Sequence, residues 1–335
     1  MADEPAVTAT PSRWLRGLGW VVAVGFGLVA VALLLLSVVT VVHTWHPWLI
    51  AAATFIPFLW VPTLLCLLGL VLALTHWRRW VALGLLVALG AYWSFPLWPL
   101  PRPQIDATPA ERGIGVLAVN MQYGNGDLAA VATRVNDWVD VIVFIEHTPE
   151  LEAEFLASDL AAEFPHAQGT IRTDAGGTRF FSRTPLEVVE ALDTPFDNIV
   201  VRTTVAETEW LVAGIHAAPP QLGADAWARD GELVADLVER HLDERMLLVG
   251  DFNAIDQHHT MRGVVDAGAV NTASTRFWGE TWDPTWPVGH PWIPAFARID
   301  HYLMTPSVNG WAPTYFEVDG TDHMGILATA PKPLA

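Results

Sequence analysis

Three long apolar runs occupy the first hundred residues, and they constrain the fold of this chain more than any other feature. The runs cover residues 18–42, 48–74 and 81–98. Each reaches the roughly 20 residues that an α-helix needs to cross a hydrocarbon core. A cleaved signal peptide is the competing interpretation of the first run, but this run is longer than a signal h-region and two more follow it. We therefore expect three transmembrane helices over residues 18–98.

The distribution of arginine predicts the orientation of these helices. Arg13 and Arg16 precede the first run, and Arg78 and Arg79 lie between the second and third, whereas residues 43–47 contain neither Lys nor Arg. Because basic residues collect in cytoplasmic loops, residues 1–17 are predicted to be cytoplasmic. Three crossings then make the protein a multi-pass cell-membrane protein, with everything beyond residue 98 outside the cytoplasm.

Residues 99–113 (PLPRPQIDATPAERG) combine proline with polar residues and show no helical or strand period. We interpret them as a short, stiff linker. Residues 114–335 remain, enough for one well-buried α/β domain. The single cysteine, Cys66, lies in the second apolar run, so no disulfide within the chain can stabilise that domain.

The part of the chain beyond residue 100 is strongly acidic. It contains 34 Asp and Glu against 14 Arg and Lys, a net charge of −20, and Lys332 is its one lysine. Proteins that grip phosphate backbones without sequence preference carry a basic stripe. We therefore expect no dedicated surface for long nucleic acids, although net charge by itself mainly reports solubility.

Short apolar runs alternate with amphipathic segments in this acidic part, which is typical of a layered α/β domain. Helices are predicted over 127–138 and 224–241. Several of the intervening connections are short, which favours antiparallel neighbours and therefore mixed sheets. The predicted strands cover residues 114–119, 139–145, 178–181, 186–191, 199–205, 210–215, 245–249, 298–304 and 324–328.

Groups suited to metal binding and proton transfer stand at the ends of these runs. A rigid scaffold commonly delivers functional side chains in this way. One such motif alone, Gly250-Asp251-Phe252-Asn253, could arise by chance, but it belongs to an ordered series. The series is Asn120, Glu146, His216, Asp251, Asn253, Asp300, Asp322 and His323.

This ordered series resembles the endonuclease/exonuclease/phosphatase superfamily, whose members include DNase I-like nucleases, sphingomyelinases and inositol polyphosphate phosphatases. The resemblance covers about 114–330. It implies a four-layer α/β sandwich of two mixed β-sheets flanked by helices, with the site at one rim. The motifs that carry it are Val119-Asn120, Val143-Phe144-Ile145-Glu146, Gly214-Ile215-His216-Ala217-Ala218-Pro219, Gly250-Asp251-Phe252-Asn253, Arg298-Ile299-Asp300-His301 and Thr321-Asp322-His323.

The resemblance also implies a metal site. Glu146 would be the principal ligand of Mg²⁺, with Mn²⁺ as an alternative ion, while Asn120 would add an amide oxygen and Asp322 a second carboxylate. A hard divalent cation takes oxygen ligands and keeps several waters, so one or two carboxylates suffice to hold it.

Catalytic roles follow from the same resemblance. Asp251 would orient and deprotonate the attacking water, and Asn253 would donate a hydrogen bond to the phosphoryl oxygens. His323 would contact the scissile phosphate as an imidazolium held by Asp300. His216 would stabilise a phosphoryl oxygen or assist the leaving group.

Three further features are open to more than one interpretation. The stretch 276–294 contains Trp278, Trp282, Trp286 and Trp292, and these aromatics could bind a sugar or base, enter lipid headgroups, or simply pack the loop. The pair His258-His259 is expected to be solvated. The remaining feature is the pair Arg179 and Arg183. Both are expected to be structural, although either could bind a substrate phosphate.

Two functions remain after these arguments. The first is a Mg²⁺-dependent phosphodiesterase or phosphatase acting outside the cytoplasm on a lipid-linked or small phosphate ester; cleavage of DNA or RNA stays open because a bound cation can offset repulsion locally. The second is a non-catalytic membrane module that binds a phosphorylated envelope lipid, since a fold alone does not fix an activity. A pure binder would have no need of the full set of metal ligands and base.

Overall fold

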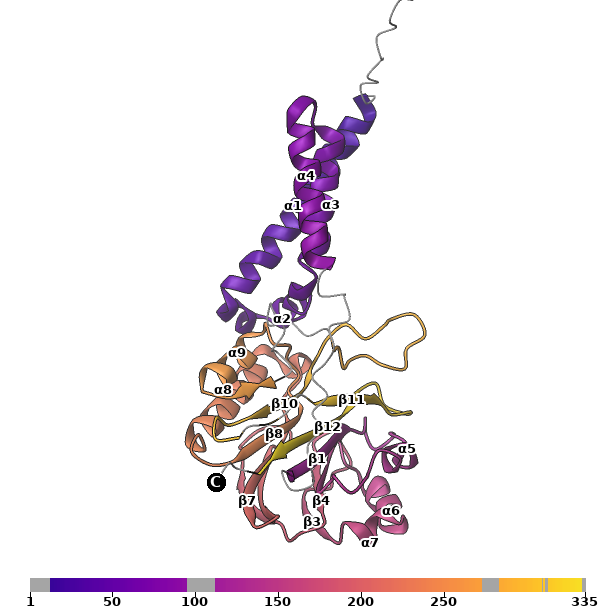
Figure 1. The fold of residues 1–335 in the computed structure, drawn as a ribbon, viewed down its shortest axis with the longest axis vertical. Helices are drawn as coiled ribbons and strands as arrows, with labels where there is room; N and C mark the ends of the chain where they lie inside the picture. Colours follow the sequence, from indigo (N-terminus) through magenta and orange to yellow (C-terminus); the bar gives the residue numbers. More distant parts are fainter. Residues whose placement is uncertain (1–12, 95–111, 273–282, 309, 311–312, 333–335) are drawn as a thin grey trace, which may run out of the picture. The chain divides into compact units, whose positions relative to one another are not determined.

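The computed structural model describes residues 13–94, 112–272, 283–308, 310 and 313–332. The chain divides into two compact units, one within Met1–Val39 and Phe55–Gln104 and the other within Thr40–Thr54 and Ile105–Ala335. Figure 1 labels many of their helices and strands. Most of the predicted linker, 99–113, lies outside the described residues.

The first unit is helical. α1 and α3 approach each other closely at two glycines: a Cβ on Gly69 would lie 2.5 Å from the backbone nitrogen of Ala23, and one on Gly19 would lie 2.7 Å from the carbonyl oxygen of Gly69. Small residues allow such contact between helices in apolar surroundings. The elements of this unit are α1 (Arg13–Val38), η2 (Ile56–Phe58), α3 (Trp60–Ala73) and α4 (His76–Ser94).

Among the described residues, two helical segments are long and apolar enough to cross a membrane, Arg13–Val38 and Ile56–Ala73. Side chains of α1 such as Val21 and Leu28 are 71% and 67% exposed, which is unlike a helix of a water-soluble core. The predicted third span, 81–98, is not matched by a helix of comparable apolarity. α4 carries Arg78 and Arg79 in its first turn, and residues 95–98 lie outside the described part.

The predicted second span, 48–74, was wrong at its start. The run is divided, and its first part belongs to the other unit as the short helix α2 (Pro47–Ala53), which there follows the short helix η1 (Thr40–Trp45). Pro47 occupies the first turn of α2, where a missing backbone N–H costs nothing. Ile50 of α2 is 1% exposed and packs in a core cluster with α8 and α9.

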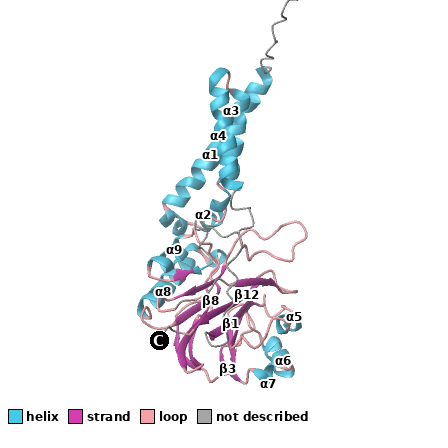
Figure 2. Cartoon of the chain, viewed as in Figure 1, coloured by secondary structure: helices cyan, strands magenta, loops and turns pink. Residues whose placement is uncertain are grey.

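Two mixed six-stranded sheets form the centre of the second unit (Figure 2). The order of the first sheet is β11-β12-β1-β2-β4-β3, and that of the second is β5-β6-β7-β8-β10-β9. The β1–β2 and β7–β8 pairs are parallel and the other neighbours are antiparallel. Their bounds are β1 Arg112–Asn120, β2 Val141–Ile145, β3 His166–Gly169, β4 Thr178–Ser182, β5 Glu187–Ala191, β6 Ile199–Val205, β7 Thr208–His216, β8 Met246–Asp251, β9 Val270–Asn271, β10 Asp300–Met304, β11 Thr314–Glu317 and β12 Met324–Pro331.

The sheets pack face to face over one core, and helices cover their outer faces. Val143, Phe180 and Val249 belong to the cluster between the sheets. Separate clusters join the second sheet to α8 and α9, and the first sheet to α5, α6 and α7. The expected arrangement of two mixed sheets flanked by helices is therefore present. The covering helices are α5 (Leu128–Ala132), α6 (Pro149–Ala157), α7 (Leu160–Glu163), α8 (Ala224–Arg240) and α9 (His259–Asp266), and the short helix η5 (Pro220–Leu222) precedes α8.

The helix predicted over 127–138 is shorter than its apolar period suggested. Asp127 caps its start by accepting the N–H groups of Ala129 and Ala130, but the helix ends at Ala132. Beyond it, the Asn136 side chain accepts the backbone N–H of Trp138 at 2.8 Å. Such a side-chain turn competes with helix for the same backbone groups.

Candidate active site

Polar residues from both sheets meet at one edge of the sandwich. Asn120 ends β1 and Glu146 follows the parallel strand β2. His216 and Asp251 end the parallel strands β7 and β8, and Asp300 begins β10 directly opposite Asp251. Contacts of 4.0 Å or less link all eight residues of the predicted series, Asn120, Glu146, His216, Asp251, Asn253, Asp300, Asp322 and His323.

The backbone at this edge is held in unusual conformations. Four of the seven described non-glycine residues with positive φ lie here: Gln122, Tyr123, Glu146 and Asn253, with φ between 44° and 59°. Such conformations cost about 1–3 kcal/mol each and persist where the surrounding structure enforces them. Gly250 adopts φ 132°, and a Cβ there would lie 2.2 Å from the carbonyl oxygen of Ile215, so no other residue fits.

Glu146 is a buried carboxylate with two donors. Its Oε2 accepts the backbone N–H of Tyr123 at 2.8 Å, and its Oε1 accepts from Asn120 Nδ2 at 3.2 Å. Burial raises its pKa despite these hydrogen bonds. The Asn120 oxygen accepts the N–H of Gln122 at 3.0 Å, so the amide presents nitrogen to the carboxylates, and service as an oxygen ligand would require the amide to turn over.

Asp251 lies at the centre of the site. Its Oδ2 accepts from Asn120 Nδ2 at 3.2 Å, which joins the two sheets, and from Asn253 Nδ2 at 3.3 Å. Its Oδ1 accepts the backbone N–H of Asn253 at 2.8 Å. Burial raises the pKa of Asp251 to about 7, opposed by the charge of His323 and reinforced by that of Asp300. A carboxylate with this pKa can both accept and release a proton near neutral pH.

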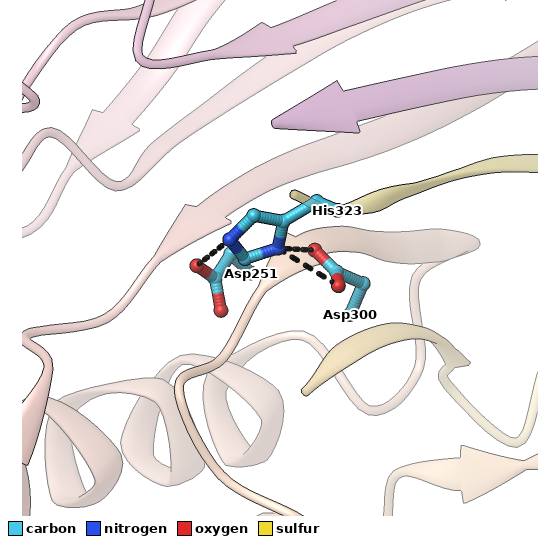
Figure 3. A group of neighbouring side chains, drawn as sticks. All are labelled: Asp251, Asp300 and His323. Carbon is cyan, nitrogen blue, oxygen red and sulfur yellow. Dashed lines mark hydrogen bonds and ion pairs between the residues drawn. The ribbon is translucent and has the colours of Figure 1, made fainter. Parts of the chain in front are cut away.

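Asp300 and His323 form a buried pair beside Asp251 (Figure 3). His323 Nδ1 lies 3.0 Å from both oxygens of Asp300, and its Nε2 lies 3.9 Å from Asp251 Oδ2. Burial alone would lower the pKa of His323, but the charges of Asp300 and Asp251 outweigh it and raise the pKa to about 10. The ring is therefore an imidazolium at neutral pH.

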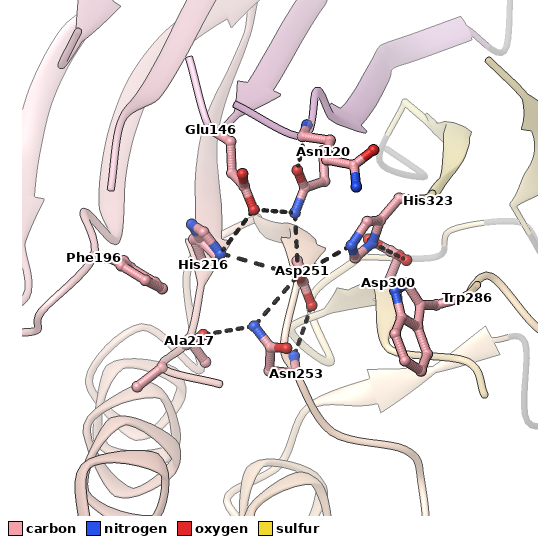
Figure 4. Close-up of polar contacts among 12 residues, drawn as sticks. Asn120, Glu146, Phe196, His216, Ala217, Asp251, Asn253, Trp286, Asp300 and His323 are labelled. Atoms are coloured by element: carbon pink, nitrogen blue, oxygen red, sulfur yellow. Dashed lines mark hydrogen bonds and ion pairs between the residues drawn. The ribbon is translucent and has the colours of Figure 1, made fainter. Parts of the chain in front are cut away.

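His216 differs from His323 in its charge. Its Nε2 lies 3.9 Å from Glu146 and 4.0 Å from Asp251, and Phe196 stacks on the ring with centroids 4.4 Å apart (Figure 4). Burial, followed by the nearby charge of His323, lowers the pKa of His216 to about 3. At neutral pH this residue can offer an N–H to an oxyanion but cannot act as a cation.

Asp322 lies at the rim of the site. Its Oδ2 accepts from Trp286 Nε1 at 2.9 Å, its Oδ1 lies 3.7 Å from His323 Nε2, and its backbone N–H donates to Gln122 Oε1 at 3.1 Å. Its side chain is 33% exposed, against 12% for Glu146. Asp322 can therefore reach a ligand from the solvent side.

One group of three imidazole and carboxylate ligands in the described part of the chain has its atoms within 4.8 Å of one another: Asp251, Asp300 and His323. In this group, however, Nδ1 of His323 shares its proton with Asp300. An imidazolium has no lone pair for a metal. The carboxylates of Glu146 and Asp322 are better suited to a hard cation, because they are oxygen donors with no such proton.

The structure adds two aromatic residues to the predicted set. Trp286, which holds Asp322, belongs to the tryptophan-rich stretch noticed in the sequence, whereas Phe196 carried no signal at all. Trp292 is 87% exposed, and the other two members of the stretch, Trp278 and Trp282, lie outside the described residues.

The two arginines that the sequence left open are structural in the fold. Arg179 Nη2 pairs with Glu152 at 2.8 Å, and Arg183 Nη2 pairs with Glu163 at 2.9 Å. His301, next to Asp300, bonds through Nε2 to the carbonyl oxygen of Ala254 at 2.8 Å.

Similarity to known proteins defines the class to which this fold and site belong. The sequence profile of the Endonuclease/Exonuclease/phosphatase family matches residues 117–323, and the chain belongs to this family. It is therefore a hydrolase of phosphoric ester bonds, in a family whose enzymes are metal-dependent. No curated protein matches the chain in sequence.

Several solved structures are similar to this chain at low sequence identity. TDP2 of D. rerio, crystallised with a single-strand DNA product, is 15% identical with a TM-score of 0.50, and the match covers 65% of this chain and 99% of that one. The Endonuclease/exonuclease/phosphatase of Beutenbergia cavernae is 18% identical with a TM-score of 0.49 over 66% and 72% of the two chains. Sphingomyelinase C of Streptomyces griseocarneus is 15% identical with a TM-score of 0.45 over 65% and 99%.

Proposed function

We propose that this chain is a membrane-anchored Mg²⁺-dependent phosphodiesterase or phosphatase whose catalytic domain lies outside the cytoplasm. The observation that carries the proposal is the position of Asp251. It lies between the amide of Asn120, which also contacts Glu146, and the imidazolium of His323, which Asp300 holds. A water near Asp251 would thus face a base, a metal-binding carboxylate and a positive charge at once.

The residues at the site fit a divalent cation. Glu146 and Asp322 would hold it, with Asn120 as a third ligand after its amide turns. Burial raises the pKa of Glu146, so its hydrogen bonds and the nearby charge of His323 do not fully offset the cost of burying this carboxylate. A bound Mg²⁺ would supply further positive charge beside Glu146 and polarise the phosphoryl oxygen.

The remaining residues have separate roles in the in-line attack of water on phosphorus. Asp251 would take a proton from the attacking water, and His323 would stabilise the negative charge that builds on the phosphoryl oxygens. The Asn253 amide donates to the carbonyl oxygen of Ala217 at 2.9 Å and to Asp251 at 3.3 Å. Donation to a phosphoryl oxygen would replace the longer of these bonds.

The segment Thr40–Thr54 supports three crossings and a catalytic domain on the side opposite the N-terminus. This segment lies between α1 and α3 in the sequence yet belongs to the same compact unit as residues 105–335. Because a bilayer cannot pass through one folded unit, this division favours an even number of crossings between residues 54 and 105. If α3 crosses, α4 would be the segment that crosses back, with Arg78 and Arg79 in the cytoplasmic turn.

The acidic catalytic unit favours a lipid-linked or small phosphate ester over long nucleic acid. We expect the full-length chain in detergent to hydrolyse a phospholipid or a small phosphate ester with Mg²⁺, to lose activity in EDTA and to regain it when Mg²⁺ is restored. A panel of phospholipids, phosphomonoesters, DNA and RNA would measure this. Binding of a phospholipid without release of any product, with Mg²⁺ or Mn²⁺ present, would instead favour a non-catalytic module.

The pKa values of the site predict a bell-shaped pH dependence of kcat/KM. Activity should fall as pH drops through about 7, because Asp251 gains a proton, and as pH rises through about 10, because His323 loses one. A bound cation would shift the acid limb further down. Asp300→Asn removes a negative charge that raises both pKa values, so both limbs should move to lower pH. A pH profile in which only one limb moves would contradict the shared role of Asp300.

A further inference from the structure

Buried aromatic rings connect the segment Thr40–Thr54 to the catalytic loop, residues 251–255, which carries Asp251 and Asn253. His43, which belongs to this segment, is 0% exposed and lies edge-on to His258 with ring centroids 5.7 Å apart. His258, expected from the sequence to be solvated, is 2% exposed. That expectation was wrong because the residues that cover His258 come from a segment more than two hundred positions earlier.

His43 completes the start of α9. Its Nδ1 accepts the backbone N–H of His259, the first residue of α9, at 3.3 Å. The Thr40 hydroxyl lies 3.1 Å from Nδ1 of the same His259. The first N–H groups of a helix have no partner within it, and the N-cap residue of α9 makes no side-chain cap. The segment therefore supplies a cap that α9 lacks.

His258 connects the segment to the catalytic loop. Its Nδ1 accepts the backbone N–H of Ile255 at 3.1 Å, so Nε2 carries the proton and donates to the carbonyl oxygen of Ile50 at 3.1 Å. Burial lowers the pKa of His258 to about 3. The ring is neutral, with one nitrogen bonded to the loop and the other to α2.

Trp227 of α8 provides a second connection to the same loop. Its ring lies edge-on to His258, with centroids 5.4 Å apart and an interplanar angle of 87°, and its Nε1 donates to the carbonyl oxygen of Asn253 at 2.9 Å. Asn253 is one of the residues with positive φ. The loop 251–255 is thus fixed at two backbone atoms, by two side chains that contact each other.

We propose that the segment Thr40–Thr54, which joins the first two apolar helices, positions the loop that carries Asp251 and Asn253. His258 and Trp227 are the positioning residues through which the segment fixes this loop. This inference rests on the proposed function of that loop. It also implies that residues 105–335 alone would lack the carbonyl partner of His258 and the cap of α9, so the isolated domain would have a loosened catalytic loop.

Two substitutions in the full-length chain in detergent test the proposal. His258→Phe keeps a ring but loses both hydrogen bonds, and His43→Leu removes the nitrogen that accepts the N–H of His259 together with the ring that lies against His258. We expect kcat to fall about tenfold with KM within about twofold, because misplacement of catalytic groups affects the reaction more than substrate binding. His46→Asn is the matched control: His46 lies exposed on the same segment and caps α2, and asparagine can still cap, so kcat should not change.

Amide hydrogen exchange provides a readout that does not need activity. In the wild-type chain the amides of Ile255 and His259 should be protected. Each should exchange at least tenfold faster when its partner is replaced, Ile255 in His258→Phe and His259 in His43→Leu. Fast exchange of both amides in the wild type would show that the segment does not dock.

The outcomes separate the two proposals. Faster exchange without loss of kcat would overturn the positioning role, and an equal loss in His46→Asn would do the same. A wild-type chain inactive on every phosphate ester would contradict the proposed function, while exchange would still decide whether the segment docks. If His258→Phe does not fold, His43→Leu decides whether the segment positions the loop, since it removes the cap of α9 and leaves both bonds of His258 in place.

Discussion

Replacement of Asp251 by asparagine is expected to lower kcat roughly 10³-fold, the scale of a lost general base. Asparagine has nearly the same shape but cannot accept a proton from water. It also places an NH₂ group where Asp251 now accepts from Asn120 and Asn253. Because burial raises the pKa of Asp251, its ionised form costs stability in the folded state above pH 7. Asparagine avoids this cost, which offsets the unfavourable contacts of its NH₂ group. The variant should therefore keep its thermal midpoint while losing turnover, and both can be measured on the whole chain.

Asp140→Asn is the matched control for this experiment. Asp140 is also buried, its pKa is also raised by burial, and it accepts the N–H of Gly115 at 2.9 Å. It precedes β2 at the end of the strand opposite Glu146, so it has no contact with the site. Turnover within about twofold of wild type is expected for this variant. If Asp251→Asn also kept more than a tenth of the wild-type kcat, Asp251 could not be the base.

The strand ends of the site could be predicted from the sequence because each ends abruptly. Val141–Ile145 is continuously apolar and buried, and Glu146 follows at once. The same holds for Met246–Asp251, where Gly250 and Asp251 close the strand. Each of these strands has a parallel neighbour, β1 for β2 and β7 for β8, so Asn120 and Glu146 lie at one edge of the first sheet and His216 and Asp251 at one edge of the second. The remaining residues of the site were predicted from the order of the motifs along the chain.

Contacts made by side chains could not be predicted in the same way. Nothing near Phe196 in the sequence indicates that its ring stacks on His216. The orientation of the Asn120 amide depends on the N–H of Gln122, whose positive φ is set by the fold. The division of the apolar run 48–74 between two units likewise depends on the apolar side chains of α8 and α9 against which Ile50 packs. Periodicity describes the strands and helices themselves, but not which surfaces they meet.

The loss of His323 is expected to have the next largest effect. His323→Gln keeps a donor near the phosphate but removes the positive charge, since the pKa of His323 lies near 10 and the ring is an imidazolium at neutral pH. Removal of one such stabilising group typically costs 10²–10³-fold in kcat, and we expect about 10²-fold here. Single-turnover measurement of the chemical step would test this with saturating substrate.

A double-mutant cycle with Asp300→Asn separates the two members of the pair. Asp300 contacts His323 through Nδ1 at 3.0 Å, so its effect on the reaction should pass through that ring. Asp300→Asn alone should lower kcat about tenfold, but in the His323→Gln background it should lower kcat by less than about twofold, because residues in direct contact are not additive. Additive losses would mean that Asp300 acts on the reaction by another route, such as through Asp251, whose pKa its charge also raises. The comparison would then assign Asp300 to the base rather than to the imidazolium.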